Sequence, residues 1–253
     1  MFLSSIIYTM DELDFMIIFK TEHLKKRIGN ENDGGYVILD GFDYDLLLSC
    51  GISNDTSFEN NFLELNKSTQ CYAFDGTINS LPKNSNKNIN FIQKNISKEN
   101  SEKCSNMLDI IENNDNIFLK MDIETWEYDW IKILEEKHLN KFKQIVIEFH
   151  FAFTYSEEIF KKFSYPIEVI EKIECIKKIS NTHYLVHFHG NNCCGVCSYK
   201  GITIPNVFEC TFVRKDLCNN VSLNDKSIPD ILLDKPNISN KPDITLRGYP
   251  YTI

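Results

Sequence analysis

One stretch of the chain, running from Ile117 to Trp130, restricts the fold more than any other. Its first part is apolar and short enough for a buried strand, and Asp122 and Glu124 follow where that strand should end. Apolar residues then recur at helical spacing, at Trp126, Trp130, Ile131 and Leu134. This order predicts one βα unit, and ligands of open α/β sheets bind just beyond the carboxyl ends of such strands. The two acids are therefore placed to form a site, although Asp122 is equally suited to capping the helix.

A second strand-to-helix turn lies upstream of this unit. The apolar run Leu46 to Leu48 is followed by Gly51, which allows a tight turn, and by small polar residues that can begin the helix containing Phe58. A turn of this kind brings backbone N–H groups close to a ligand. It lacks the spacing of a dinucleotide fingerprint and the lysine of a P-loop. The next apolar run ends at Asp75, near the position where an acid binds ribose hydroxyls in doubly wound folds.

The rest of the chain continues the alternation of strands and helices. Further strands are predicted over 90–96, 142–150, 184–192 and 207–213, and helices over 105–111, 157–163 and 166–179. From about residue 229 the chain is polar and interrupted by prolines, so we expect an irregular tail that wraps the surface or the mouth of the site. The pattern is that of an α/β fold with a mainly parallel sheet.

Net charge and cysteine content restrict the kinds of partner and the cellular compartment that we expect for this chain. The net charge of −9 and the pI near 5.2 argue against a nucleic-acid backbone or an anionic membrane as the main partner. Asp11, Glu12 and Asp14 interrupt the apolar N-terminus, which favours an amphipathic helical segment over 1–26 that packs on a domain spanning 27–253. Nine cysteines, an odd number with several in predicted strands, indicate reduced thiols and a cytoplasmic protein.

A succession of short motifs resembles FkbM-type methyltransferases over most of the chain, from Arg27 to Pro250. The motifs are Asp33-Gly-Gly-Tyr-Val37, Ser49-Cys-Gly-Ile-Ser-Asn-Asp-Thr-Ser-Phe-Glu59, Ala73-Phe-Asp75, Lys120-Met-Asp-Ile-Glu124, Ile147-Glu-Phe-His150 and His187-Phe-His-Gly-Asn-Asn192. The resemblance implies an S-adenosylmethionine (SAM) dependent O-methyltransferase. It also implies a Rossmann-like sheet of seven strands, the last one antiparallel, with helices on both faces.

The resemblance also implies roles for particular residues. Those expected to bind the cofactor are Gly51, Ser53 and Asp55 against the methionine moiety, Asp75 on the ribose, Asn95 and Ile96 beside the adenine, and Asp122 at the sulfonium. The chain departs from the family pattern at three places. Ser49 stands where many methyltransferases have an acid, Ser53 and Asp55 replace glycines, and Thr125 and Trp126 replace small residues.

Activation of an acceptor hydroxyl requires a base or a Lewis acid beside it. Five such groups fall at predicted carboxyl ends of parallel strands, namely Asp122, Glu148, His150, His187 and His189. Together they could bind a divalent metal such as Mg²⁺ or Mn²⁺. Alternatively a histidine, His150 or His187, acts as the base and a carboxylate, Asp122 or Glu148, orients it. In a third alternative, His187 or His189 only forms hydrogen bonds within the sheet.

The sequence thus predicts transfer of a methyl group from SAM to a sugar hydroxyl of a glycan or glycoconjugate, and the acceptor class follows from the resemblance alone. Two other functions stay open. One is a non-catalytic SAM-fold module that binds a carbohydrate or a protein partner. The other is an NAD-dependent oxidoreductase, which is disfavoured because the glycine turn lacks the dinucleotide spacing and no second nucleotide-binding half follows.

Overall fold

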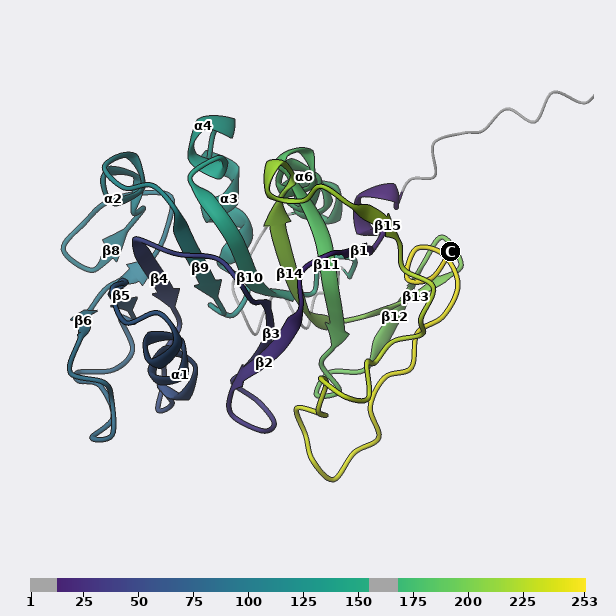
Figure 1. Cartoon of the computed structure of the whole chain (residues 1–253), viewed down its shortest axis with the longest axis horizontal. Helices are drawn as coiled ribbons and strands as arrows, with labels where there is room; N and C mark the ends of the chain where they lie inside the picture. The colour runs from purple at the N-terminus through teal and green to yellow at the C-terminus, as the bar shows by residue number, and fades with distance from the viewer. Residues whose placement is uncertain (1–12, 155–167) are drawn as a thin grey trace, which may run out of the picture.

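A seven-stranded sheet forms the centre of the computed structural model, which describes residues 13–154 and 168–253 (Figure 1). The strand order is β11 (His183–Gly190), β14 (Val207–Arg214), β10 (Phe142–His150), β9 (Ile117–Met121), β4 (Leu46–Cys50), β5 (Gln70–Phe74) and β6 (Ile89–Ile92). Strand β14 runs antiparallel to both of its neighbours, and the remaining pairs are parallel. The fold predicted from the sequence, a Rossmann-like α/β sheet of seven strands with the last one antiparallel, is confirmed.

The central strands are buried on both faces of the sheet. Every residue of β4 and β9 is buried, which explains why both strands are mostly apolar in sequence and do not alternate between apolar and polar residues. Because these strands are parallel and adjacent, their carboxyl ends lie side by side: Cys50 pairs with Met121 in the register. The residues that follow each strand, Gly51 and Asp122, therefore meet at the same edge.

One face of the sheet is covered by a helix and a hairpin. Helix α1 (Ser57–Leu65) packs Phe58 and Phe62 against Phe118 of β9. Beside it lies the hairpin of β2 (Lys25–Gly29) and β3 (Gly35–Leu39), whose turn contains the Asp33-Gly34-Gly35 signal. This hairpin takes the place of a second helix on this face and brings Tyr36 over the sheet.

Helices cover the opposite face. They are α2 (Leu108–Glu112), α3 (Glu127–Ile133), α4 (Glu136–Leu139) and α6 (Val169–Thr182) (Figure 1). Trp130 of α3 is fully buried, and its Nε1 donates a hydrogen bond to the Asn106 carbonyl. Helix α2 begins later than predicted because β8 (Cys104–Ser105) pairs with β7 (Asn95–Ile96). The predicted helix over 157–163 lies outside the described residues.

The N-terminal segment differs from the expected helix. Within residues 13–26 it forms a 3-10 turn, η1 (Asp14–Met16), and strand β1 (Phe19–Thr21), which pairs with β15 (Val221–Leu223); β2 begins at Lys25. The β-branched and aromatic residues after this turn favour extended backbone. Ile18 forms an isolated bridge to Leu185, so the segment extends the edge of the sheet. The expectation of a helix over 1–26 is wrong for the described part.

The C-terminal segment is irregular, as predicted. It follows the hairpin of β12 (Val196–Tyr199) and β13 (Ile202–Pro205), strand β14, the turn η2 (Lys215–Leu217) and β15. Residues 224–253, which we call the tail, pass close to the carboxyl end of β11, at the yellow end of the trace in Figure 1. Asn192 anchors the tail there: its amide group donates to the Ile238 carbonyl and accepts from the Ile238 N–H.

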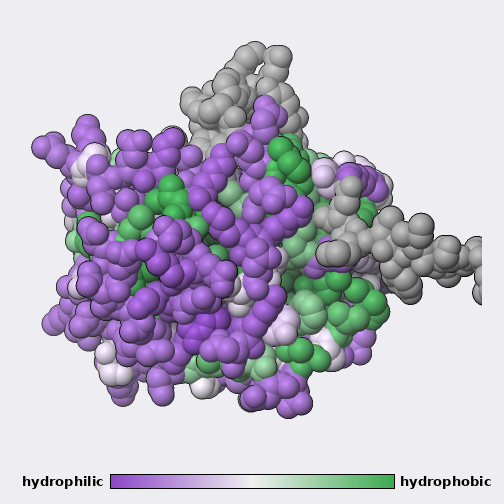
Figure 2. Space-filling model, turned by 90° about the horizontal axis from the view of Figure 1, so that it is seen from above, coloured by the Kyte–Doolittle hydropathy of each residue, from purple (hydrophilic) through white to green (hydrophobic). Residues whose placement is uncertain are grey.

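The surface seen in Figure 2 is mostly hydrophilic, with smaller hydrophobic areas between the polar residues. In the part of the chain that the structure describes, no helix has the length and apolar character needed to cross a bilayer. All nine cysteines lie in that part, and each is a free thiol, as expected.

Candidate functional site

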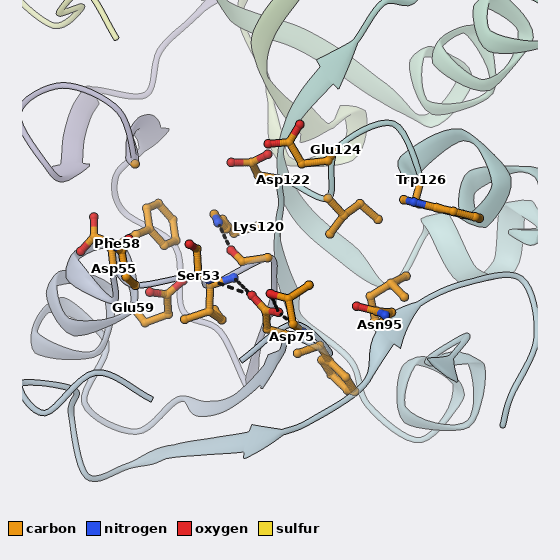
Figure 3. Close-up of a pocket in the computed structure, with 18 of the residues that line it drawn as sticks. Ser53, Asp55, Phe58, Glu59, Asp75, Asn95, Lys120, Asp122, Glu124 and Trp126 are labelled. Atoms are coloured by element: carbon orange, nitrogen blue, oxygen red, sulfur yellow. Dashed lines mark hydrogen bonds between the residues drawn. The ribbon is translucent and has the colours of Figure 1, made fainter. Parts of the chain in front are cut away.

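A cavity of about 870 Å³ opens at the carboxyl ends of β4, β5 and β9. All seven residues that the sequence predicts to bind the cofactor line it: Gly51, Ser53, Asp55, Asp75, Asn95, Ile96 and Asp122. They come from four separate segments of the chain and surround the cavity from several sides (Figure 3). The structure therefore brings the whole predicted set together, at the edge of the sheet where α/β folds bind ligands.

Gly51 is required by the contact between the two central strand ends. A Cβ atom at this position would lie 1.7 Å from the carbonyl oxygen of Asp122, and the backbone has φ of +83°. The Gly51 carbonyl also accepts a hydrogen bond of 2.6 Å from Nζ of Lys120. Contacts with Lys120 of β9 and with Asp122 after it thus fix the glycine turn, and Gly51 also lines the cavity.

Asp75 closes the glycine turn from the neighbouring strand. Its Oδ2 accepts the backbone N–H groups of Ile52 and Ser53 at 3.0 and 2.7 Å, and its Oδ1 accepts the N–H and hydroxyl of Thr77 at 2.7 and 2.6 Å. Burial raises the pKa of Asp75, but these hydrogen bonds outweigh it and hold the pKa below its usual value. A ribose hydroxyl would have to exchange with one of these donors.

Trp126 and Asn95 lie on the side of the cavity opposite Asp55 and Glu59 (Figure 3). The Trp126 side chain is 44% exposed at the rim, and Asn95 Oδ1 accepts the Gly76 N–H at 3.2 Å. Ile96 also lines this side. An aromatic ring, an amide and an aliphatic side chain offer a suitable border for a planar base. The sequence places Trp126 in the helical pattern and among the departures from the family pattern, but does not assign it to the site.

Glu59 is a cavity residue that the sequence analysis did not assign to the site. It lies in the first turn of α1 and is only 1% exposed. Its Oε1 accepts a hydrogen bond from Ser49, whereas its Oε2 has no hydrogen-bond partner among the described residues. Burial raises the pKa of Glu59, and the charge of Lys120 opposes that increase. The sequence signal that could have identified Glu59 is an acidic residue among the apolar residues of the helix that follows the glycine turn.

Asp122 and Glu124 lie side by side at the upper end of the cavity in Figure 3, and ligand atoms of both lie within 4.8 Å of one from His150. His150 Nε2 lies 3.8 Å from Asp122 Oδ1 and 3.6 Å from Glu124 Oε2. On the other side of the imidazole ring, Glu127 Oε1 lies 3.3 Å from Nδ1 and accepts the His150 backbone N–H at 2.8 Å. Burial lowers the pKa of His150, but the surrounding carboxylates, Glu127 foremost, raise it well above its usual value.

A second, smaller cavity of about 270 Å³ adjoins the first, with Asp33, Asp122 and Glu124 lining both. Its other polar walls come from Glu148, His150, Asn191 and Asn237, the last of which belongs to the tail. Glu148 accepts a hydrogen bond of 2.8 Å from Asn191, and burial raises its pKa well above the usual range. Acids and amides together suit a neutral polyhydroxy ligand and disfavour an anionic one.

His187 and His189 do not join this group. Each contacts an acid of the tail: His187 Nε2 lies 2.8 Å from Asp234 Oδ1, and His189 Nε2 lies 3.1 Å from Asp243. His189 Nδ1 is also 3.3 Å from Glu209 of β14. Neither histidine lines either cavity. The sequence correctly places both on strand β11, but their partners come from an irregular segment far along the chain, and they fasten the tail to the sheet.

Comparison with known proteins adds only distant structural similarities. No family model matches the chain, and no curated protein does so either. A protein from Streptococcus thermophilus described as a hemolysin is 14% identical, with 72% of each chain covered and a TM-score of 0.36. Precorrin-6y C5,15-methyltransferase from Geobacter metallireducens is 10% identical, with 68% of this chain and 82% of that chain covered and a TM-score of 0.32. Scores this low carry no argument about function.

Proposed function

We propose that the chain is a SAM-dependent O-methyltransferase whose acceptor is a sugar hydroxyl of a glycan or glycoconjugate in the cytoplasm. The observation that carries this proposal is the pair of adjoining cavities at one edge of the sheet. The larger has the volume of a pocket for a cofactor-sized ligand. The smaller lies beyond Asp122 and Glu124, where an acceptor would meet the reactive end of that ligand.

The residues present fit SAM. Glu59 Oε2 is a buried acceptor without a partner among the described residues, as a ligand ammonium group requires. Asp75, Asn95 and Ile96, to which the resemblance assigns the ribose and the adenine, line the larger cavity. When bound, SAM supplies an electrophilic methyl group on a positively charged sulfur. Asp122, which lines both cavities, would face that sulfur and the acceptor at once.

The smaller cavity favours a neutral hydroxyl acceptor. Glu148, Asn191 and Asn237 can exchange hydrogen bonds with sugar hydroxyls, and the acids would repel a phosphate or carboxylate. His150 stands beside this acceptor position with Glu127 behind it. It can promote loss of the hydroxyl proton as the ligand of a cation that polarises the hydroxyl, or as a base in its unprotonated form, which its raised pKa disfavours near neutral pH.

The experiment has a binding part and a turnover part. Titration calorimetry should show binding of SAM and S-adenosylhomocysteine and none of NAD. Incubation with SAM and a panel of monosaccharides, nucleotide sugars and oligosaccharides should release S-adenosylhomocysteine with at least one acceptor. His150→Gln should keep SAM affinity within a few-fold and lose turnover, whereas Glu64→Gln, an exposed acid on α1, should change neither.

Other outcomes would select a different function. SAM binding without turnover on any hydroxyl acceptor would favour a non-catalytic module that binds a carbohydrate or a protein. NAD binding in preference to SAM would favour an oxidoreductase. Wild-type turnover in His150→Gln would remove this histidine from the chemistry.

A further inference from the structure

We propose that Asp122, Glu124 and His150 form a binding site for a divalent cation of the Mg²⁺ or Mn²⁺ type. One ligand atom from each residue, two carboxylate oxygens and one imidazole nitrogen, lies within 4.8 Å of the others. The distances from His150 Nε2 to the two acids, 3.8 and 3.6 Å, exceed those of hydrogen bonds. Donors about 2.1 Å from a shared ion lie roughly 3 to 4 Å apart, which these separations match.

Groups behind the ligands hold them in this orientation. Glu127 Oε1 lies 3.3 Å from Nδ1 of His150, so Nε2 faces the two acids. His150 is 5% exposed, and its Nε2 makes no hydrogen bond to any residue that the structure describes. The Tyr36 hydroxyl donates to Asp122 Oδ2 at 3.0 Å, which leaves Oδ1 toward the histidine. A carboxylate behind a histidine and a hydroxyl behind a carboxylate are the usual supports of protein metal ligands.

The surrounding charge also calls for a cation. Buried Glu127 lies behind His150, and buried Glu148 lines the smaller cavity beside the three proposed ligands, as does the exposed Asp33. Burial of the Glu127 and Glu148 carboxylates costs free energy unless positive charge or protonation compensates it. Lys120 contributes one charge nearby, but its Nζ donates to the Gly51 carbonyl at the other side of Asp122. A divalent ion between Asp122, Glu124 and His150 would supply positive charge at this point.

This ligand set differs from the one expected from the sequence. Glu124 replaces Glu148, His187 and His189, because Glu148 is hydrogen-bonded to Asn191 and the two histidines contact the tail. Three protein ligands leave further coordination positions open toward the smaller cavity. Their use by an acceptor hydroxyl rests on the proposed function; the cation site itself does not.

Mn²⁺ is a suitable probe, because it accepts carboxylate and imidazole ligands and its free form gives a strong electron paramagnetic resonance signal. Titration of the full chain with Mn²⁺, without SAM, should show one bound ion per chain, displaced by excess Mg²⁺. Glu124→Gln should weaken Mn²⁺ affinity at least tenfold, and His150→Gln should do the same. Glu124 has a side chain 71% exposed, so its variant is expected to fold normally.

Glu64→Gln is the matched control, because it removes an exposed acid away from the site and should bind Mn²⁺ like the wild type. Absence of bound Mn²⁺ in the wild type would overturn the proposal. Unchanged affinity in Glu124→Gln, with thermal unfolding like that of the wild type, would overturn it too. Calorimetry with SAM on the same samples keeps the two proposals apart, since a chain that binds SAM but no Mn²⁺ loses only the cation site.

Discussion

Ser49 at the end of strand β4 donates a hydrogen bond of 2.5 Å to Glu59 in the first turn of helix α1. Both side chains are buried. The hydrogen bond therefore joins the carboxyl end of a central strand to the first turn of the helix that follows it. The serine keeps one oxygen of Glu59 occupied, and the other remains directed at the large cavity without a partner among the described residues.

Replacing Glu59 with glutamine should weaken SAM binding by about 1.5–3 kcal/mol, the scale of a hydrogen bond to a charged group. The stability of the unliganded protein should not fall, because the change removes a buried carboxylate that burial disfavours. Calorimetry with SAM and urea denaturation measure the two effects. Ser49→Ala retains the carboxylate and should keep affinity within a few-fold. Equal SAM affinity in Glu59→Gln and wild type would rule out this role.

The ribose assignment of Asp75 can be separated from its structural role. Asp75→Asn should weaken SAM binding by about 1.5–3 kcal/mol. Thr77→Val removes the hydroxyl that donates to Oδ1 at 2.6 Å and leaves the backbone hydrogen bond in place. It should therefore retain or increase SAM affinity, because a ribose hydroxyl no longer competes with that donor. If folded Asp75→Asn bound SAM as tightly as the wild type, Asp75 would be a structural residue of the turn only.

His187 and Asp234 should contribute to stability rather than to catalysis. Each is 5% exposed, and the two lie 2.8 Å apart. His187→Gln and Asp234→Asn should each lower the free energy of unfolding by about 3 kcal/mol, and the double variant by less than the sum. Mn²⁺ and SAM affinities of His187→Gln should stay near wild type at a temperature where it is folded. Additive losses of stability would contradict the pairing.

His183 should make stability fall at acidic pH. Burial lowers its pKa to about 4, and its Nε2 lies 3.0 Å from the Phe142 carbonyl oxygen. The unfolded chain binds the proton near pH 6.5, so this histidine leaves stability unaffected above that pH and reduces it as pH falls toward 4, by about 3 kcal/mol. Urea denaturation at pH 8, 6 and 5 should show a shallower loss in His183→Gln. Parallel profiles for the two proteins would contradict the lowered pKa.

Most of the sheet could be predicted from the sequence because its central strands carry their own signal. Strands β4 and β9 are mostly apolar, and each is followed by a residue type that stops a strand or caps a helix, Gly51 and Asp122. The meeting of Gly51, Asp75 and Asp122 at one cavity then follows from the parallel arrangement alone. Predicting that residues at adjacent strand ends lie together does not require the conformations of the loops.

Residues held by long-range contacts could not be predicted in the same way. Tyr36 reaches Asp122 from a hairpin, and His187 meets Asp234 from the irregular tail; no periodicity encodes either pairing. Residues 13–26 do not form the expected helix for a related reason, because the extended backbone around Phe19 is stabilised by pairing with β15, about 200 residues away in the chain. Tertiary pairing decided the local conformation there.

The two tryptophans of the chain differ in their surroundings, and this difference has an optical consequence. Trp130 is fully buried in α3, so its emission should be blue and indifferent to quenchers in solution. Trp126 is 44% exposed on the wall of the large cavity, so its emission should be red and accessible to iodide. A ligand that enters the cavity would therefore shift or shield one component of the spectrum and leave the other as an internal reference. The unlabelled protein is its own fluorescent reporter of whether the cavity is filled.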